Sequence, residues 1–488
     1  MRKSFKDIAS SFLLISIGIT LLPEISVKAQ EVEKIVENTT AYLENLDAQD
    51  KFSGTVLIAK DGVPILKKAY GLANRSFNVP NKIDTKFNLG SMNKMFTGVA
   101  ILQLVEQGKL ALDDKIIKHV PDYSNKEIAS KVTIHQLLTH TSSMGLYWTD
   151  EYFKTSKDLF KDVEDYLPLF VDEPLQFEPG SKFSYSNSGY MVLGLIIEKV
   201  TGQSYFDYVM ENIYKPAGMI NTDAYELDYV VPNLAVGYTQ HGAKEGTLRN
   251  NIYIHVCKGG PAGGGYSTVE DLLSFSNALI GNKLLTPEYT ELAIKGKVRR
   301  SENVMYAYGI QDRKENNHRI IGHGGGFPGI SSKLDIYKDL GYTVIVMSNF
   351  DRGSIEVENF VKEQLIGKTQ SMKNVELTTL ILEHITEDGY ESGIELYEKN
   401  REKGRILEGM VNQYGYELLE ENKLSEAIDV FKFNVYAHPE SANCYDSLGE
   451  VYMKTGDKEL AIKNYEKSLE LNPDNKNAVE MLKKLRKN

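Results

Sequence analysis

The stretch Phe87-Asn88-Leu89-Gly90-Ser91-Met92-Asn93-Lys94-Met95-Phe96 places a serine and a lysine three positions apart where a helix is expected to begin. Apolar residues then recur at helical spacing, at Met95, Val99, Leu102 and Val105. Residues three apart lie on the same side of a helix, so Lys94 can reach Ser91. A serine hydroxyl needs a base to become a nucleophile, and lysine is a base only if its pKa is lowered. The spacing therefore indicates a nucleophilic serine, although chance also produces it in a long chain.

The overall composition sets the class of protein. The chain has 488 residues, more than one ordinary domain, and its 42% hydrophobic and 25% charged residues are typical of globular proteins. A formal net charge of −11 argues against a nucleic-acid partner. The two cysteines, Cys257 and Cys444, are far apart and predict no disulfide framework. The nine histidines show no metal-ligand spacing, so we expect neither a metal nor another cofactor.

The N-terminus resembles an export signal. Arg2, Lys3 and Lys6 precede an uncharged, mostly apolar run over residues 8–22, and small residues near Ala29 offer a cleavage point. This pattern predicts a signal peptide over residues 1–29, and therefore a protein that acts outside the cytoplasm, periplasmic or secreted. The apolar run is short for a stable membrane span, so we expect no span after signal removal. An uncleaved anchor is the alternative.

The next segment, residues 30–366, predicts an α+β domain. Asp61-Gly62 between two β-rich runs is a hairpin signal. Helices and long loops occupy residues 108–282, and strands then return. We expect strands at 54–60, 63–70, 306–311, 318–323, 331–337 and 342–347, and helices at 32–46, 134–139, 193–200, 271–280 and 355–365. Strands at both ends suggest one antiparallel sheet flanked by helices, with an inserted helical lobe.

A linker over residues 367–374 leads to an all-α region, residues 375–488, that contains an internal repeat. Equivalent residues are 34 positions apart: Gly415 and Gly449, Ala427 and Ala461, Phe431 and Tyr465, Pro439 and Pro473. This period and residue order are those of the tetratricopeptide repeat. Residues 377–405 fit the same register weakly. A plain helical bundle is the alternative. Such repeats usually bind peptides, so a protein or peptide partner is expected here, although an internal supporting role is also open.

Three further groups of residues could carry chemistry. Tyr185-Ser186-Asn187 offers a proton-shuttling hydroxyl and an amide, and His323-Gly324-Gly325-Gly326 ends a predicted strand. Alone, each is also explained as an ordinary polar loop or glycine turn. The glycine-rich stretch 259–265 lacks the lysine of a phosphate-binding loop, and we interpret it as a structural turn beside the site. The chain has no Gly-x-Ser-x-Gly elbow, which argues against an α/β-hydrolase.

Taken together, Ser91-x-x-Lys94, Tyr185-Ser186-Asn187 and His323-Gly324-Gly325 resemble, in this order, the motifs of the β-lactamase-related serine hydrolases. This family includes class C β-lactamases, D-peptidases and esterases. The resemblance covers residues 31–365 and implies a β-lactamase/transpeptidase-like fold.

The resemblance also implies roles for the motif residues. Ser91 would be the acylated nucleophile, Lys94 its base, and Tyr185 the proton relay to the leaving group. Substrate would be held by Asn187, His323, Gly324 and Gly325. The backbone N–H groups of Ser91 and Gly326 would form the oxyanion hole.

One departure from the family pattern bears on the substrate. Where many relatives have Lys-Thr-Gly, this chain has His323-Gly324-Gly325, which lacks the hydroxyl and the permanent charge that help to hold a substrate carboxylate. The expectation is therefore a secreted serine hydrolase that cleaves an ester or amide, with a D-amino-acid peptide as one candidate. A penicillin-binding D,D-carboxypeptidase or β-lactamase is the first alternative. A catalytically inactive scaffold that binds a protein partner through its repeats is the second. Sequence alone does not fix the substrate.

Overall fold

The computed structural model describes residues 30–244 and 246–487, so the predicted signal peptide lies outside the described residues. The described chain forms two compact units, the first ending at Gly367 and the second beginning at Lys368. Helix α13 (Gln370–Asp388) begins inside the expected linker over residues 367–374, because the Thr369 hydroxyl accepts a hydrogen bond from the Met372 N–H and caps the helix. The linker is therefore shorter than expected, and the second unit starts before residue 375.

An eight-stranded antiparallel sheet organises the first unit, in the order β2-β1-β14-β13-β12-β11-β10-β9. Its strands are β1 (Gly54–Lys60), β2 (Val63–Tyr70), β9 (Val298–Ser301), β10 (Val304–Tyr306), β11 (Gln311–Glu315), β12 (His318–Phe327), β13 (Ile330–Tyr337) and β14 (Tyr342–Ser348). The pairing of β1 with β14 joins the two ends of the unit in one sheet, as the sequence predicts.

One expected strand is wrong. The sequence suggested a continuous strand over residues 306–311, but Tyr306 ends β10, Gln311 begins β11, and the two residues pair with each other across a turn. Gly309 adopts φ +77° in this turn, and a Cβ there would collide with the backbone of Lys94. Glycine is required in this turn because the backbone of Lys94 lies against it.

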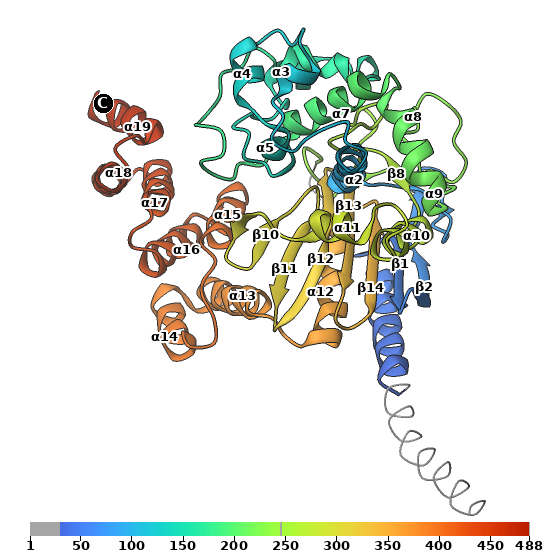
Figure 1. The fold of residues 1–488 in the computed structure, drawn as a ribbon. Helices are drawn as coiled ribbons and strands as arrows, with labels where there is room; N and C mark the ends of the chain where they lie inside the picture. The colour runs from blue at the N-terminus through green and yellow to red at the C-terminus, as the bar shows by residue number, and fades with distance from the viewer. Residues whose placement is uncertain (1–29, 245, 488) are drawn as a thin grey trace, which may run out of the picture. The chain divides into compact units, whose positions relative to one another are not determined.

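The helices over residues 116–209 form a lobe at one end of the sheet, which Figure 1 draws in cyan and green. Several helices in this part of the chain are short. Side-chain hydroxyl groups cap the N-termini of four helices, those that follow Thr133, Ser186, Ser204 and Thr268. The α-helices from β2 to β9 are α2 (Asn93–Glu106), α3 (Ile116–His119), α4 (Lys126–Lys131), α5 (Ile134–Leu138), α6 (Asp150–Lys154), α7 (Asn187–Thr201), α8 (Tyr205–Val209), α9 (Lys215–Ala217), α10 (Val269–Ile280) and α11 (Pro287–Ile294). The 3₁₀ turns are η1 (Gly90–Met92), η2 (Lys157–Leu159) and η3 (Glu164–Leu169), and η4 (Met210–Tyr214) is a π-helical turn. The other strands form two-stranded sheets: β3 (Leu72–Asn74) pairs with β4 (Val79–Pro80), β5 (Phe87–Asn88) with β8 (Tyr266–Ser267), and β6 (Tyr238–Thr239) with β7 (Arg249–Asn250).

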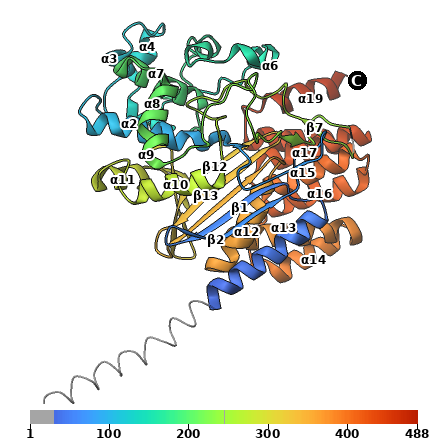
Figure 2. The ribbon, with the colours of Figure 1, turned by 90° about the vertical axis from the view of Figure 1, so that its right-hand side faces the viewer.

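The two faces of the sheet bury separate apolar cores. Alternate residues such as Leu57 and Ile345 pack with α2, α7 and α10, whereas Val56 and Val344 pack with the helix over residues 30–48 and with α12 (Gly353–Ile366). Figure 2 shows the N-terminal helix and α12 near the strands. This alternation follows from the two-residue period of a strand buried on both faces. The site described below lies on the α2 face.

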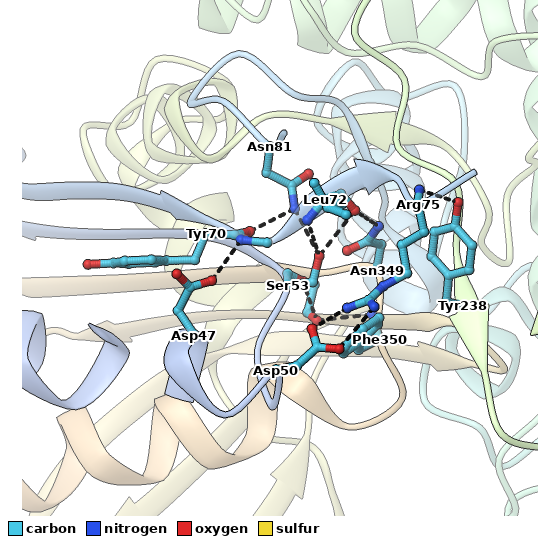
Figure 3. A network of polar contacts seen from close by, with 12 residues as sticks. Asp47, Asp50, Ser53, Tyr70, Leu72, Arg75, Asn81, Tyr238, Asn349 and Phe350 are labelled. Carbon is cyan, nitrogen blue, oxygen red and sulfur yellow. Dashed lines mark hydrogen bonds and ion pairs between the residues drawn. The ribbon is translucent and has the colours of Figure 1, made fainter. Parts of the chain in front are cut away.

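A polar network centred on Ser53 joins the chain at the ends of β1, β2 and β14 (Figure 3). The Ser53 hydroxyl accepts from the Leu72 N–H at 3.1 Å and from Asn81 Nδ2 at 3.0 Å, while Asn349 Nδ2 donates to the Leu72 carbonyl at 2.9 Å. Arg75 pairs with Asp50 at the end of the N-terminal helix. These contacts fix the edge of the sheet, and we assign them a structural role.

The second unit is a row of helix pairs. Its elements are α13, α14 (Tyr390–Asn400), α15 (Glu408–Glu420), α16 (Leu424–Ala437), α17 (Ala442–Thr455), α18 (Lys458–Leu471) and α19 (Lys476–Lys487). The Cβ position of Gly415 lies 2.6 Å from the Phe431 ring, and that of Gly449 lies 3.2 Å from the Tyr465 ring. Each repeat thus needs a glycine where its first helix meets the aromatic ring of its second. None of the described helices in either unit is long and apolar enough to cross a membrane.

Candidate active site

Ser91 lies in the 3₁₀ turn η1, immediately before helix α2. Gly90 adopts φ +50°, and a Cβ at this position would lie 3.0 Å from Gly325 Cα and from the Gly326 nitrogen. Glycine is therefore required both for the turn and for its close approach to strand β12. The Asn88 side chain accepts from the Gly90 N–H at 2.8 Å and holds the turn in place.

Lys94 is buried one helical turn from Ser91, and its amine has three polar neighbours. Its Nζ atom lies 3.4 Å from Ser91 Oγ, 2.8 Å from Asn187 Oδ1 and 2.5 Å from the Ala262 carbonyl oxygen. A neutral amine has two N–H donors and one lone pair. Asn187 and Ala262 accept the two hydrogens, which leaves the lone pair free to accept the Ser91 hydroxyl hydrogen.

The protonation state of Lys94 follows from its surroundings. Burial lowers the pKa of Lys94 well below its usual value, and no carboxylate in the described part of the chain opposes that shift. Its polar partners are an amide oxygen and a carbonyl oxygen, which accept hydrogen bonds without supplying a full negative charge. Lys94 is therefore suited to act as a base rather than as a permanent cation.

Tyr185 and Asn187 reach the site from the start of helix α7. The Ser186 hydroxyl between them accepts from the Gly189 N–H at 2.9 Å and caps the helix, which fixes both neighbours. The Tyr185 hydroxyl lies beside the Ser91 side chain, and burial raises the pKa of Tyr185 to about 12. Tyr185 is thus a neutral O–H donor beside the nucleophile, and Lys94 Nζ lies 4.8 Å from its ring centre.

The open edge of strand β12 faces Ser91. Phe327 and Ile330 close a two-residue hairpin, so every second residue back from Phe327 bonds to β13 while Gly324 and Gly326 direct their N–H groups the other way. Strand β11 pairs with β12 only as far as Gly322. The Gly326 N–H is therefore not used by a neighbouring strand and lies beside the turn of Ser91, where the family resemblance implies an oxyanion donor.

His323 occupies the strand as predicted but is a buried neutral residue. Its Nδ1–H donates to the Gly324 carbonyl at 2.6 Å, and its Nε2 accepts from the Tyr306 hydroxyl at 3.1 Å. Burial, with Lys94 nearby, lowers the pKa of His323 to about 3. His323 therefore lacks even the partial charge that a histidine ordinarily carries near neutral pH. His323 supplies no positive charge to a substrate carboxylate.

The glycine-rich stretch 259–265 has a larger part in the site than a turn beside it. Three successive carbonyl oxygens accept hydrogen bonds from side chains of helix α2: Gly260 from Asn93 at 3.1 Å, Pro261 from Thr97 at 2.8 Å, and Ala262 from Lys94. These contacts fix the lysine and the helix that carries Ser91. Sequence reasoning missed them because a backbone carbonyl has no residue signature.

His140 is a second group that sequence reasoning did not assign to the site. It is fully buried, with its ring centre 4.1 Å from that of Tyr185, and its Nδ1 accepts the Ser186 N–H at 3.0 Å. Burial, with Lys94 nearby, lowers the pKa of His140 well below its usual value, so the ring is neutral. It supports the segment that carries Tyr185 and Asn187.

An aromatic pocket adjoins Ser91 and was also missed. It has about 420 Å³ of empty volume, including the part open to solvent, and its lining includes Ser91, Gly326, Tyr147, Trp148 and Phe327. The run Tyr147-Trp148 to Tyr152-Phe153 is a visible aromatic cluster in the sequence. Its partners come from distant parts of the chain, so only the fold assembles the pocket.

Comparison with known families agrees with this geometry. Residues 39–366, more than half of the chain, match the β-lactamase family, and residues 442–475 match the tetratricopeptide repeat. The chain belongs to the β-lactamase family. The relatives described in the next paragraph are serine hydrolases of this family. The fold and the family expected from the sequence are confirmed.

Among curated β-lactamase family members, penicillin-binding protein 4* of Bacillus subtilis is 31% identical over 322 residues, which span 63% of this chain and 70% of that protein. A penicillin-binding protein of Bacillus halodurans has a similar solved structure, with TM-score 0.60, 31% identity and coverage of 68% of this chain and 98% of that one. A D-stereospecific amidohydrolase of a Streptomyces species gives TM-score 0.57 and 25% identity, covering 70% of this chain and 99% of that one.

Proposed function

We propose that this protein is an exported serine hydrolase that cleaves an ester or amide through an acyl-enzyme on Ser91. The observation that carries the proposal is the placement of the buried Lys94 amine. Its two N–H groups donate hydrogen bonds to Asn187 and Ala262, and its lone pair faces Ser91 Oγ. The family membership of the chain supports the same reaction class.

Acylation follows from these positions. Lys94 Nζ accepts the Ser91 hydroxyl proton as Oγ bonds to the substrate carbonyl carbon, and the carbonyl oxygen becomes an oxyanion. The N–H groups of Ser91 and Gly326 stabilise that charge. The Tyr185 hydroxyl gives its proton to the leaving group and regains one from the Lys94 ammonium, so the bond to the leaving group breaks with all protons accounted for.

Deacylation uses the same residues in the reverse sense. A water molecule attacks the acyl carbonyl carbon, and its proton passes through Tyr185 to Lys94. Ser91 Oγ then leaves and takes back a proton from Lys94, which restores the free enzyme. No carboxylate is needed in this scheme, because the neutral amine and the tyrosine hydroxyl can carry the proton in both half-reactions.

The choice of substrate separates the proposal from its alternatives. Relatives of the chain are named penicillin-binding proteins and a D-stereospecific amidohydrolase, which supports a D-amino-acid peptide as one candidate. A β-lactam or a D-Ala-D-Ala terminus presents a carboxylate, and His323 is neutral. We therefore favour an uncharged ester or amide over β-lactam or D,D-carboxypeptidase activity. The arrangement of Ser91, Lys94 and Asn187 argues against an inactive scaffold.

A three-substrate assay tests the proposal. Purified protein is incubated with a short-chain p-nitrophenyl ester, a chromogenic cephalosporin and a D-Ala-D-Ala peptide. The Ser91→Ala variant is compared with Ser181→Ala, which alters an exposed serine in the loop before Tyr185. We expect ester turnover that depends on Ser91 and not on Ser181. Absence of Ser91-dependent turnover on all three substrates would contradict the proposal, and turnover of the cephalosporin alone would overturn the substrate preference.

Export and partner binding are separate parts of the proposal. The basic start and apolar run of residues 1–29 support export, and the repeat match over residues 442–475 supports a protein or peptide partner for the second unit. Full-length protein expressed in a bacterium is expected outside the cytoplasm with a new N-terminus near residue 30. Intact chains confined to the cytoplasm would contradict the export proposal.

A further inference from the structure

The aromatic pocket beside Ser91 has a definite position relative to the reacting groups. Tyr185, the proton donor to the leaving group, does not line it, whereas Ser91 and Gly326 do. Along β12, His323 lies at the Tyr185 end and Phe327 at the pocket end, four residues or about 13 Å apart. A substrate whose leaving group meets Tyr185 therefore extends its acyl group toward the pocket.

The pocket walls are aromatic and aliphatic. Tyr147, Trp148 and Tyr152 form one side, with ring centres 6.3 Å apart for Tyr147 and Trp148 and 5.5 Å for Tyr147 and Tyr152. The ring centre of Phe327 lies 5.6 Å from that of Trp148, and Val256 and Ile330 add aliphatic surface. The lining also includes the uncharged polar side chains of Asn88 and Ser91, and His255. Rings at these separations contact one another, so together they form a continuous aromatic wall, and such a surface suits an aromatic or branched apolar group.

No aspartate, glutamate, lysine or arginine is among the residues that line this pocket in the described structure. The ionisable His255 is buried and its pKa is lowered to about 4, so it is neutral at neutral pH. An acyl group with a carboxylate or a free amine would enter without a counter-charge, so its desolvation would cost free energy that no ion pair offsets.

We propose that Tyr147, Trp148, Tyr152 and Phe327 form the acyl-group subsite and select an uncharged aromatic or branched apolar acyl group. This inference rests on the proposed Ser91 acyl-enzyme and names its substrate class. Carboxylated acyl groups and amino acids with a free α-amine are poor substrates, so a D-amino acid enters only when its amine is blocked.

Esters with one leaving group and different acyl groups test the selection. Relative to p-nitrophenyl acetate, and after correction for uncatalysed hydrolysis, p-nitrophenyl phenylacetate should have a kcat/KM at least about tenfold higher. The p-nitrophenyl monoester of succinic acid and the D-phenylalanyl ester should both fall below the phenylacetyl ester. Equal values for the phenylacetyl and acetyl esters, or a preference for either charged ester, would overturn the proposal.

Variants of Trp148 test whether the aromatic pocket causes the preference for the phenylacetyl group. Trp148→Ala should lower the phenylacetyl-to-acetyl ratio of kcat/KM at least about fivefold, and Trp148→Phe should largely restore it. Phe153→Ala removes an aromatic ring of the same segment that is 58% exposed and does not line the pocket, so both esters should react as in the wild type. Equal loss on both esters in Trp148→Ala, without rescue by phenylalanine, would contradict a subsite role.

A binding measurement tests the acyl-group subsite independently of catalysis by Ser91. Trp148 is the only tryptophan of the chain, so intrinsic tryptophan fluorescence reports on this pocket alone. In Ser91→Ala protein, phenylacetamide should change the fluorescence saturably and acetamide should not. No saturable change would overturn the subsite even if Ser91 is the nucleophile. A saturable change together with ester turnover that persists in Ser91→Ala would support the subsite and refute the acyl-enzyme.

Discussion

The Nζ atom of Lys94 lies 2.8 Å from Oδ1 of Asn187, and this partner is an amide rather than a carboxylate. An amide oxygen orients the amine without stabilising its charged form, so burial lowers the lysine pKa unopposed. The identity of residue 187 thus decides whether Lys94 is a base or a cation.

Replacing Asn187 with aspartate should remove the base. In Asn187→Asp, a carboxylate of nearly the same shape would pair with Lys94 and raise its pKa, so the amine would stay protonated at neutral pH. We expect kcat/KM on the ester to fall about 10²- to 10⁴-fold, with the rising limb of the pH–rate profile moved to higher pH. Asn250→Asp, at an exposed position, is the matched control. An unchanged pH–rate profile in Asn187→Asp would contradict the role given to Lys94.

Gly90 offers a test of the oxyanion geometry. A methyl group in Gly90→Ala would meet Gly325 Cα and the Gly326 nitrogen at 3.0 Å and push the turn of Ser91 away from β12. The loss of one aligned donor predicts a fall in rate of about 10²- to 10³-fold. Gly108 also has positive φ but nothing within 4 Å of its Cβ position, so Gly108→Ala isolates the backbone strain. Similar activity in the two variants would refute the proximity argument, and melting temperatures would show whether both fold.

The neutral state of His323 predicts a pH dependence of stability. Burial lowers its pKa to about 3, below the value of about 6.5 expected in an unfolded chain. Between these values the unfolded state binds the extra proton, so stability falls as the pH falls from about 6.5 toward 3. His323→Gln should make this slope shallower by up to about 1.4 kcal/mol per pH unit in chemical denaturation series. An unchanged slope in His323→Gln would contradict the neutral state of this histidine in the folded protein.

The repeat unit makes a prediction of its own. The Cβ of Gly415→Ala would lie 2.6 Å from the Phe431 ring, and overpacking of this kind costs about 1–3 kcal/mol. Gly409, in the same helix α15, has nothing within 4 Å of its Cβ position, so Gly409→Ala should be neutral or stabilise by up to about 1 kcal/mol. Urea denaturation followed by far-ultraviolet circular dichroism should separate the two variants. Equal stability would argue against the helix contact that defines the repeat.

Local signals were enough to predict much of the fold. The Asp61-Gly62 turn set the first hairpin to the residue, because the turn type and its flanking strands are encoded within a few positions. The strand predicted over residues 306–311 failed because the chain reverses at Gly309, in a turn that packs against the Lys94 backbone, which is far away in the sequence.

The same contrast between local sequence signals and long-range contacts applies to the candidate active site. Ser91, Lys94, Tyr185, Asn187 and His323 lie together as the motifs predict. Residue type alone could not predict the neutral state of His323, because burial and the nearby Lys94 lower its pKa. The Ala262 carbonyl has no sequence motif because it is a backbone group. The aromatic pocket has none because its residues come from separate segments of the chain.

Intact-mass analysis of the acyl-enzyme tests the central claim most directly. Protein mixed with p-nitrophenyl phenylacetate and quenched in acid during turnover should gain the mass of one phenylacetyl group, and peptide mapping should place it on Ser91. Ser181→Ala should gain the same mass, and Ser91→Ala should gain none. An adduct on another residue, or an unchanged adduct in Ser91→Ala, would contradict the account.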